Sequence, residues 1–240
     1  MIEINSLAAV KKEEIVQAVL DYFHGKTYLE IGMSAGNSFW PIRARRKWGV
    51  DPNPKIRFER MLKRFFANCR KFQEEKIFKM TSGDFFLRTS GRLKKYGLDV
   101  ALIDGLHTYS QSLKDVLNCL AYLNKGGVIL MHDCNPTSEA MAYSASCQDA
   151  ARPKLPEGDD RWCGDVWKSI VHLRSTRNDL VVFVLDCDYG VGVIARGRPE
   201  TQLNDSVKQI ERMTYFDLNS RRQELLNLKE PKFLQSFLRP

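Results

Sequence analysis

Acidic and histidine side chains stand at the ends of two short apolar segments of this 240-residue chain. Asp104 and His107 follow one segment, and His132 and Asp133 end the other. If the segments are neighbouring parallel strands, the four side chains meet in one crevice. In a first interpretation, His107 or His132 is a general base, because imidazole titrates near neutral pH. In a second, Asp104, His132 and Asp133 bind a divalent metal that orients a hydroxyl group and lowers its pKa.

A structural role is the alternative for each histidine. His107 can cap a helix that begins near Ser110, and His132 can be an interior histidine whose hydrogen bonds are satisfied. Several polar residues nearby are expected to pack against a helix, to cap one or to orient a ligand. We expect no nucleophile among them. These residues are Tyr109, Cys134, Asn135, Asp165 and His172.

A glycine-rich turn follows the first apolar segment of the chain. Gly32 and Gly36 lack Cβ atoms, so the backbone can turn sharply and a ligand can lie against it. Asn37–Ser38 can cap a helix over residues 37–46, whose free N–H groups would point at that ligand. Glu30 lies at the end of the apolar segment. Its carboxylate, a hydrogen-bond acceptor, is expected to point into the same crevice.

Acids also end the later apolar segments, at Asp51, Asp84 and Asp104. A carboxylate that ends the second strand of a βαβ unit is placed to bind the two hydroxyls of a ribose, and Asp51 has this position. Ligands of parallel sheets bind at the carboxyl ends of the strands. The repeated position of the acids therefore indicates one binding edge.

Alternating short apolar segments and amphipathic stretches predict an α/β fold, a parallel sheet with helices on both faces. The strands are expected at 27–31, 48–51, 76–80, 99–104 and 128–132, followed by an antiparallel hairpin at 180–186 and 190–195. The helices are expected at 8–24, 37–46, 55–69, 85–95, 110–123 and from about 162 to 174. Apolar positions among charges predict further helices beyond residue 202, which pack on the core or on a second subunit.

Composition favours one domain with appendages, since 43% of the residues are hydrophobic. We expect an N-terminal helix over 1–25, a main domain over 26–198 with a lid or insert at about 134–162, and a helical extension over 199–240. The sequence shows no apolar signal region and no run of the ~20 apolar residues that span a bilayer. Six scattered cysteines without a Cys-x-x-Cys pair predict a cytoplasmic protein without disulfides. The net charge of +8 is spread along the chain, which favours solvated surfaces over a nucleic-acid partner.

In their order and spacing, these motifs resemble the class I S-adenosylmethionine-dependent methyltransferases. Asp104-Gly105-Leu106-His107-Thr108-Tyr109 resembles the Asp-Gly-x-His-x-Tyr motif of a small-molecule and glycan O-methyltransferase group. The resemblance covers residues 26–196. It implies a doubly wound, Rossmann-like sheet of seven strands, mostly parallel, with the C-terminal antiparallel hairpin.

The resemblance also implies a role for each residue of the binding edge. Asp51 would bind the ribose, Asp84 with Phe85 the adenine, and Asp104 would lie beside the reactive end of the cofactor. The residues expected around the methionine part are Glu30, Gly32, Ser34 and Gly36.

A metal is a further implication of the resemblance. Catechol-type methyltransferases, related by fold, place acids and an amide at two strand ends for Mg²⁺. Here His132 stands where an acid is expected, and histidine suits Mn²⁺ or Zn²⁺ better than Mg²⁺. The interpretations with a general base alone and with a metal are equally open at this point.

The expected function is methyl transfer to a hydroxyl of a small molecule. A sugar or glycoconjugate is the first choice of acceptor, by analogy. The expected partner is thus a sugar-like or anionic small molecule. An NAD-dependent oxidoreductase is an alternative, but Ser34 and Asn37 interrupt the Gly-x-Gly-x-x-Gly spacing. A non-catalytic cofactor-binding scaffold is another, and the intact set of acids and histidines argues against it. The C-terminal helices are expected to support a homo-oligomer.

Overall fold

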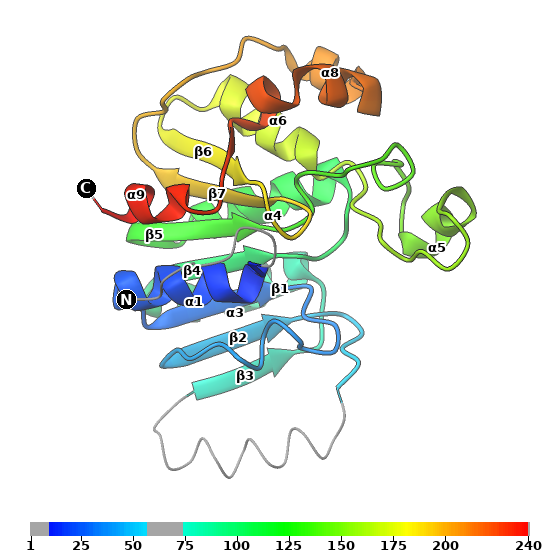
Figure 1. Cartoon of the computed structure of the whole chain (residues 1–240). Helices are drawn as coiled ribbons and strands as arrows, with labels where there is room; N and C mark the ends of the chain where they lie inside the picture. Colours follow the sequence, from blue (N-terminus) through cyan, green and yellow to red (C-terminus); the bar gives the residue numbers. More distant parts are fainter. Residues whose placement is uncertain (1–9, 57–73, 240) are drawn as a thin grey trace. The chain divides into compact units, whose positions relative to one another are not determined.

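The computed structural model describes residues 10–56 and 74–239. Within these ranges, eight strands form one sheet in the order β3-β2-β1-β4-β5-β7-β6-β8 (Figure 1). The strands are β1 Thr27–Ile31, β2 Arg46–Val50, β3 Glu74–Phe78, β4 Leu98–Ile103, β5 Leu123–Met131, β6 Leu180–Leu185, β7 Val191–Arg196 and β8 Leu228–Lys229. The expected α/β fold is confirmed, with the short β8 as an additional strand.

The helices are α1 Lys12–Tyr22, α3 Ser82–Tyr96, α4 Tyr109–Leu120, α5 Gln148–Ala151, α6 Trp167–Thr176, α7 Val207–Arg212, α8 Tyr215–Leu226 and α9 Phe233–Leu238, with a 3₁₀ turn, η1, at Arg152–Lys154. In the described ranges, α1 precedes β1, α3 and α4 lie on either side of β4 in the sequence, and the other helices follow β5. The chain divides into two compact units. Of the described residues, unit 1 contains 10–11, Leu106–Lys114 and 130–239, and unit 2 contains 12–56, 74–105 and Asp115–Ile129.

The parallel strands β1 to β4 form the centre of unit 2. All five residues of β1 are buried, as expected of a strand with a parallel neighbour on each side. In the registers of these pairs, Ile31 lies beside Val50 on one side and beside Ile103 on the other. Because these three residues each end a strand, the segments that follow them begin at one edge of the sheet.

Helix α3 shows how local sequence fixes the elements of unit 2. Thr81 is its N-cap, and the Oγ1 atom of Thr81 accepts a hydrogen bond from the backbone N–H of Asp84 at 3.1 Å. The N–H of Gly97 donates to the carbonyl of Leu93 at the other end, and Gly97 has a positive φ of 65°. Lys94 and Lys95 in the last turn complement the helix dipole.

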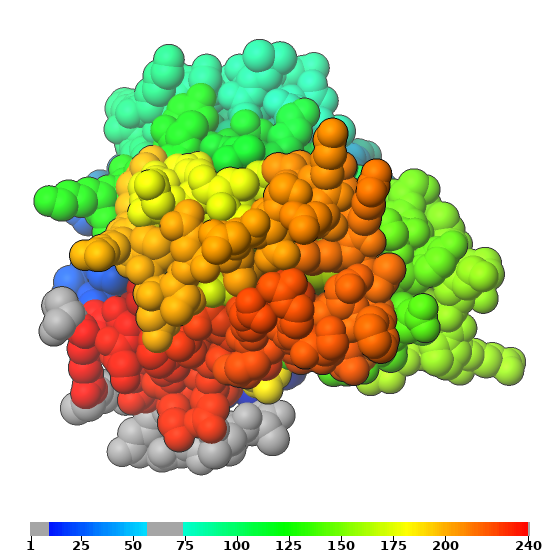
Figure 2. Space-filling view, turned by 90° about the horizontal axis from the view of Figure 1, so that it is seen from above, coloured from blue at the N-terminus to red at the C-terminus, as the bar shows by residue number. Residues whose placement is uncertain are grey.

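Unit 1 contains the antiparallel pair β6–β7, which confirms the predicted hairpin. Helices α7 to α9 (orange to red) spread over the face seen in Figure 2. Arg174 of α6 is buried and binds this C-terminal part, since its guanidinium donates to the Thr201 hydroxyl at 2.7 Å and to the Leu225 carbonyl at 3.0 Å. The chain beyond β7 is therefore attached to unit 1 through a buried charged group.

One predicted helix is wrong. Residues 37–41 form turns, and β2 already begins at Arg46, so no helix occupies 37–46. The N–H of Trp40 makes a single helical bond to the Gly36 carbonyl at 2.9 Å, and Pro41 has no N–H to continue the pattern. The N–H of Arg43 donates instead to the side chain of Gln17 at 2.7 Å. The helix predicted at 55–69 lies almost wholly outside the described residues.

The turn at Gly32 gives a prediction about stability. Gly32 has a φ of +86°, and a Cβ atom there would lie 2.0 Å from the carbonyl oxygen of Asp104. Gly32→Ala should therefore lower the free energy of unfolding by about 3 kcal/mol or more, measured by urea denaturation. Gly91→Ala is the matched control, because nothing lies within 4 Å of the added methyl group. In the middle of α3, it should stabilise by up to about 1 kcal/mol. Equal unfolding free energies for the two variants would contradict this account.

Candidate functional site

His107 is held by the segment 162–164 within unit 1. Its Nδ1 atom lies 2.6 Å from the carbonyl oxygen of Trp162, and its ring stacks on the Trp162 indole with centroids 5.3 Å apart. Gly164 presses against the same residue, since a Cβ atom at Gly164 would lie 1.9 Å from the His107 carbonyl oxygen. These contacts fix the orientation of the imidazole.

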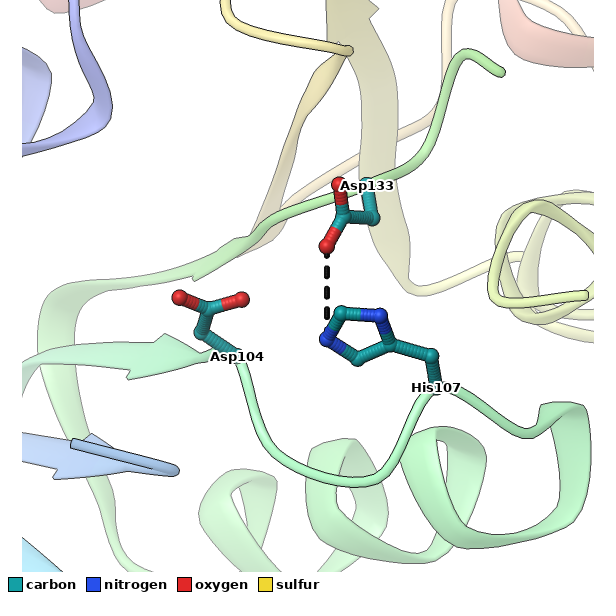
Figure 3. Close-up of side chains that lie close together, drawn as sticks. All are labelled: Asp104, His107 and Asp133. Atoms are coloured by element: carbon teal, nitrogen blue, oxygen red, sulfur yellow. Dashed lines mark ion pairs between the residues drawn. The ribbon is translucent and has the colours of Figure 1, made fainter. Parts of the chain in front are cut away.

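The contact with Trp162 also decides the tautomer of His107. A carbonyl oxygen only accepts hydrogen bonds, so Nδ1 of His107 carries the ring proton and donates it. The other ring nitrogen, Nε2, faces the Oδ2 atom of Asp133 at 3.3 Å (Figure 3). In a neutral imidazole that nitrogen presents a lone pair to a carboxylate. The position between the two atoms is therefore suited to a proton or to a metal cation.

Asp133 is buried and joins both histidines. Its Oδ2 atom lies 3.0 Å from Nδ1 of His132 as well as near His107, and its Oδ1 atom accepts from the Cys163 thiol at 3.3 Å. The residue has a positive φ of 60°, a conformation that non-glycine residues rarely adopt. Such backbone strain persists where the surroundings impose it, which is common at functional sites.

His132 lies between two carboxylates. Its Nδ1 atom faces Asp133, and its Nε2 atom lies 3.5 Å from Oδ2 of Asp188, in the turn between β6 and β7. Only 9% of the His132 side chain is exposed, against 22% for His107. His107 is thus the more accessible imidazole of the cluster formed by His107, His132, Asp133 and Asp188.

The predicted association of His107, His132 and Asp133 is found within unit 1. Asp104 belongs to unit 2 and is joined to His107 through two intervening residues of the chain. There its Oδ2 atom lies 2.8 Å from Nζ of Lys12, the first residue of α1, and both side chains are largely buried. The Lys12 ammonium therefore compensates the charge of the Asp104 carboxylate.

Three of the polar residues with a weaker claim have structural contacts. The carboxylate of Asp165 accepts the N–H of Tyr109 at 2.6 Å, at the first turn of α4. The Tyr109 hydroxyl lies 2.6 Å from Nδ1 of His172, and burial lowers the pKa of His172 and raises that of Tyr109. These residues join α4 to the segment around α6.

The loop after β1 has a different packing from the one expected. Space for a Cβ atom at Gly32 is taken by the backbone of Asp104 and Gly105, and at Gly36 by the indole of Trp40 at 2.3 Å. The two glycines thus leave room for other residues of the protein, whereas we expected them to leave room for a ligand. The loop is nevertheless closed tightly, since the N–H of Gly32 donates to the Val50 carbonyl at 2.8 Å.

Asp51 fixes the same loop from the end of β2. Its Oδ2 atom accepts the N–H of Ser34 at 2.7 Å, and its Oδ1 atom accepts the N–H of Asn53 at 2.7 Å. Ser34 itself has a positive φ of 45°. A carboxylate offers about four acceptor positions, so this half-buried group has acceptor capacity left for two hydroxyls. The role of Asp51 toward a ribose stays a prediction.

Glu30 is fully buried beneath this loop. Its two oxygens accept the Tyr28 hydroxyl at 2.5 Å and the Ser38 hydroxyl at 2.6 Å. Burial raises the pKa of Glu30 from 4.5 to about 7, with the two hydroxyls opposing the shift. Ser38, expected to cap a helix, instead ties the residues after the glycine turn to the strand.

Asp84 and Phe85 occupy the first turn of α3. Oδ2 of Asp84 accepts the Thr81 hydroxyl at 2.9 Å in a capping arrangement. Phe85 is fully buried, and its ring packs edge-on against Phe78 and Phe86 at 5.0 and 5.4 Å between centroids. Asp84 is the more accessible of the two, and its role toward an adenine stays a prediction.

Sequence reasoning missed Lys12, the segment 162–164 and Asp188 as parts of these arrangements. Gly164 was a usable signal, because a glycine with no predicted turn or cap often marks a close backbone approach. Asp188 and Tyr189 have positive φ values of 46° and 59° and lie directly before Gly190. The Asp-Tyr-Gly sequence of this turn was the one signal for their conformation. Lys12 offered no signal beyond its charge.

Comparison with known proteins agrees with this geometry. A family model described as a methyltransferase domain matches residues 29–134. Residues 29–134 are thus similar in sequence to methyltransferase domains. The predicted class of enzyme is thereby confirmed. No curated protein matches the chain in sequence.

Solved structures are similar to the chain at low sequence identity. A Staphylococcus aureus protein assigned as a caffeoyl-CoA O-methyltransferase is 15% identical, with a TM-score of 0.50 over 81% of this chain and 88% of that chain. The Podospora anserina methyltransferase PaMTH1, bound to S-adenosylhomocysteine, is 18% identical, with a TM-score of 0.49 over 78% of each chain. A Bacillus cereus O-methyltransferase in complex with S-adenosylhomocysteine is 14% identical, with a TM-score of 0.48 over 79% of this chain and 82% of that chain.

In the part of the chain that the structure describes, no helix has the length and apolar character needed to cross a membrane.

The raised pKa of Glu30 predicts a pH dependence of stability. With a pKa of about 7 folded against 4.5 unfolded, the folded state binds more protons in this window. The free energy of unfolding should therefore fall as the pH rises from about 4.5 to about 7, by on the order of 3 kcal/mol, and level off above. Glu30→Gln, which keeps a carbonyl acceptor, should remove this decline. Urea unfolding at pH 5 and pH 8 measures it, and the same decline in both proteins would refute the assignment to Glu30.

Proposed function

We propose that the chain is an O-methyltransferase that uses S-adenosylmethionine to methylate a hydroxyl of a small molecule, with a sugar or a glycoconjugate as the acceptor. The observation that carries the proposal is the pair of imidazoles on the buried carboxylate of Asp133, in a chain that contains a methyltransferase domain. When bound, the cofactor supplies an electrophilic methyl group on a sulfonium. The S. aureus protein of the same fold carries an O-methyltransferase assignment, which agrees with a hydroxyl acceptor.

The residues of unit 2 would hold the cofactor. Asp51 binds the ribose hydroxyls, with its carboxylate already oriented by the N–H groups of Ser34 and Asn53. The closed loop of residues 32–36 binds the methionine part through its backbone, and Glu30 supports this loop from below through Ser38. Asp84, at the start of α3, binds the adenine edge. Glu30 lies in β1, Asp51 directly follows β2, and Asp84 is in the first turn of α3, after β3.

The residues of unit 1 would activate the acceptor. His107 takes the proton of the hydroxyl at Nε2, since Trp162 keeps the other nitrogen protonated. Asp133 then stabilises the imidazolium through its Oδ2 atom. His132 orients the Asp133 carboxylate and is itself held by Asp188. Asp104, three residues before His107 in the sequence, is the remaining catalytic candidate and is paired with Lys12 in unit 2.

A divalent metal is the second way to activate the hydroxyl. The favouring observation is that Nε2 of His107 and Oδ2 of Asp133 face each other across 3.3 Å, where a cation can replace a proton. The metal-binding residues predicted from the sequence are Asp104, His132 and Asp133, and the geometry in unit 1 adds His107 to the candidates. Imidazole and carboxylate donors fit Mn²⁺ or Zn²⁺. Such an ion would lower the pKa of an acceptor hydroxyl.

Location and assembly complete the proposal. The cysteines in the described ranges are all free, which supports a reducing compartment such as the cytoplasm. The C-terminal helices α7 to α9 present a large part of the surface in Figure 2, and we place a homo-oligomer interface there. An NAD-dependent oxidoreductase is disfavoured by the methyltransferase match and by Ser34 and Asn37 in the turn.

The role of Asp51 predicts a loss of cofactor affinity. Asp51→Ala removes charged acceptors for two hydroxyls and should weaken S-adenosylhomocysteine binding by about 1.5–3 kcal/mol per lost bond. Isothermal titration calorimetry measures the affinity. Asp179→Ala is the control, because Asp179 is an exposed carboxylate paired with Arg177 in unit 1. Unchanged affinity in Asp51→Ala would remove Asp51 from the binding site.

The cluster predicts a separation of binding from turnover. His132→Asn should leave S-adenosylhomocysteine affinity within about twofold and reduce methyl transfer by about 10²–10⁴-fold, because it disturbs the carboxylate that supports the base and the loss is on the order of a base's own contribution. Formation of S-adenosylhomocysteine from the methyl donor measures turnover. His24→Asn is the matched control, since His24 is an exposed residue with a positive φ that asparagine tolerates. Full activity in His132→Asn would refute both ways of activating the hydroxyl.

The same assay with and without EDTA decides between those two ways. Activity that persists in EDTA assigns the reaction to His107 as the base. Activity that disappears and returns with Mn²⁺ assigns it to a metal held by the cluster.

A further inference from the structure

Unit 1 contains a cavity of about 400 Å³ beside the histidine cluster. It is lined by Val10, Lys11, Asn135, Thr137 and the turn Asp186–Gly190. Every one of these residues belongs to unit 1. A cavity of this volume accepts a small molecule of one or two sugar rings, near the lower end of usual ligand pockets.

The turn between β6 and β7 forms one wall of the cavity in an unusual conformation. Asp188, Tyr189 and Gly190 follow one another with positive φ values of 46°, 59° and 89°. The turn is fixed against the segment after β5, because the N–H of Cys134 donates to the Gly190 carbonyl at 3.0 Å and that of Asn135 to the Tyr189 carbonyl at 2.7 Å. Strain of this kind is maintained only where the surroundings impose it.

Side-chain contacts orient the polar groups of this wall. The amide nitrogen of Asn135 donates to Oδ1 of Asp186 at 2.9 Å, and the amide oxygen accepts from the guanidinium of Arg222. Arg222, on α8, also donates to the Pro136 carbonyl at 2.8 Å. Asn135 is buried. The wall is therefore preorganised, as specific recognition of a polar ligand requires.

The cavity is connected to the cluster through Asp188. This residue lines the cavity, and its carboxylate lies 3.5 Å from Nε2 of His132. The rings of His132 and Tyr189 are also nearly perpendicular, with ring centroids 6.5 Å apart. A molecule bound in the cavity would therefore lie next to the groups that we propose activate the acceptor.

The charges of the lining limit what the cavity can bind. Asp186 and Asp188 contribute two negative charges and Lys11 one positive charge, so the lining is acidic in a chain whose net charge is +8. Carboxylates accept hydrogen bonds from hydroxyls and from ammonium groups, and they repel phosphates and carboxylates. Thr137, Asn135 and Tyr189 add hydroxyl and amide groups that match a polyol.

We infer that this cavity is the acceptor subsite and that it takes an uncharged or amine-bearing sugar, not an anionic one. The inference rests on the proposed function and narrows it, because the overall basic charge had left an anionic acceptor open beside the sugar that was the first choice. Asp186 and Asp188 accept hydrogens from neighbouring hydroxyls or from an amine of the sugar. Asp188 places the ring next to His132.

Saturation-transfer NMR on the full chain tests the inference with three matched probes, glucose, glucosamine and glucose 6-phosphate. Glucose and glucosamine should bind, with glucosamine the tighter of the two, and glucose 6-phosphate should bind roughly tenfold more weakly or not at all. Asp186→Asn keeps an acceptor for Asn135 and removes one charge, so it should reduce the preference for glucosamine over glucose 6-phosphate. Asp179→Asn, at an exposed carboxylate of the same unit, should leave the preference unchanged.

Calorimetry with S-adenosylhomocysteine on the same samples separates the two proposals. Tightest binding of glucose 6-phosphate, binding of none of the three probes, or an unchanged preference in Asp186→Asn would overturn the inference while S-adenosylhomocysteine binding keeps the proposed function. Binding of glucosamine to a protein that does not bind S-adenosylhomocysteine would keep the sugar site and overturn the methyltransferase proposal.

Discussion

The proposed chemistry depends on the contact of the Asp133 carboxylate with two imidazoles. Asp133 follows β5 in a strained backbone conformation and contacts two imidazoles and a thiol, from His107, His132 and Cys163. The contacting residues come from three separate stretches of the sequence, so the site exists only when unit 1 is folded. Trp162 makes the arrangement directional, because its carbonyl fixes which nitrogen of His107 carries a proton. One buried acid thus brings both histidines together, and Trp162 sets the tautomer of one of them.

Unit 2 depends on a different constraint, the shared register of its parallel strands. Ile31 is paired with Val50 and with Ile103, so the loop after β1 starts between two neighbouring strand ends. Packing of Gly32 against the Asp104 backbone leaves no space for a side chain, and the Asp51 carboxylate holds the loop by two N–H groups. The loop that we propose binds the cofactor is therefore shaped before any ligand binds, which would reduce the ordering cost of binding.

Elements with a strong local signal were predicted from the sequence, and contacts between distant segments were not. β1 and the hairpin β6–β7 follow from apolar segments between turn residues, and the association of His107, His132 and Asp133 follows from the topology of parallel strands. The helix over 37–46 was wrong because Pro41 has no N–H to continue a helix and because the N–H of Arg43 donates to the distant side chain of Gln17. The pairing of Lys12 with Asp104 and of Asp188 with His132 joins residues 92 and 56 positions apart, and no local pattern encodes such pairs.

The central claim is that this chain binds the methyl donor and not a nicotinamide cofactor, and direct titration of the wild-type protein tests it best. Isothermal titration calorimetry with S-adenosylhomocysteine and, in parallel, with NAD compares the two ligands under the same conditions. The account predicts micromolar binding of S-adenosylhomocysteine and no heat from NAD. Binding of NAD without binding of S-adenosylhomocysteine would contradict it and would restore the oxidoreductase interpretation.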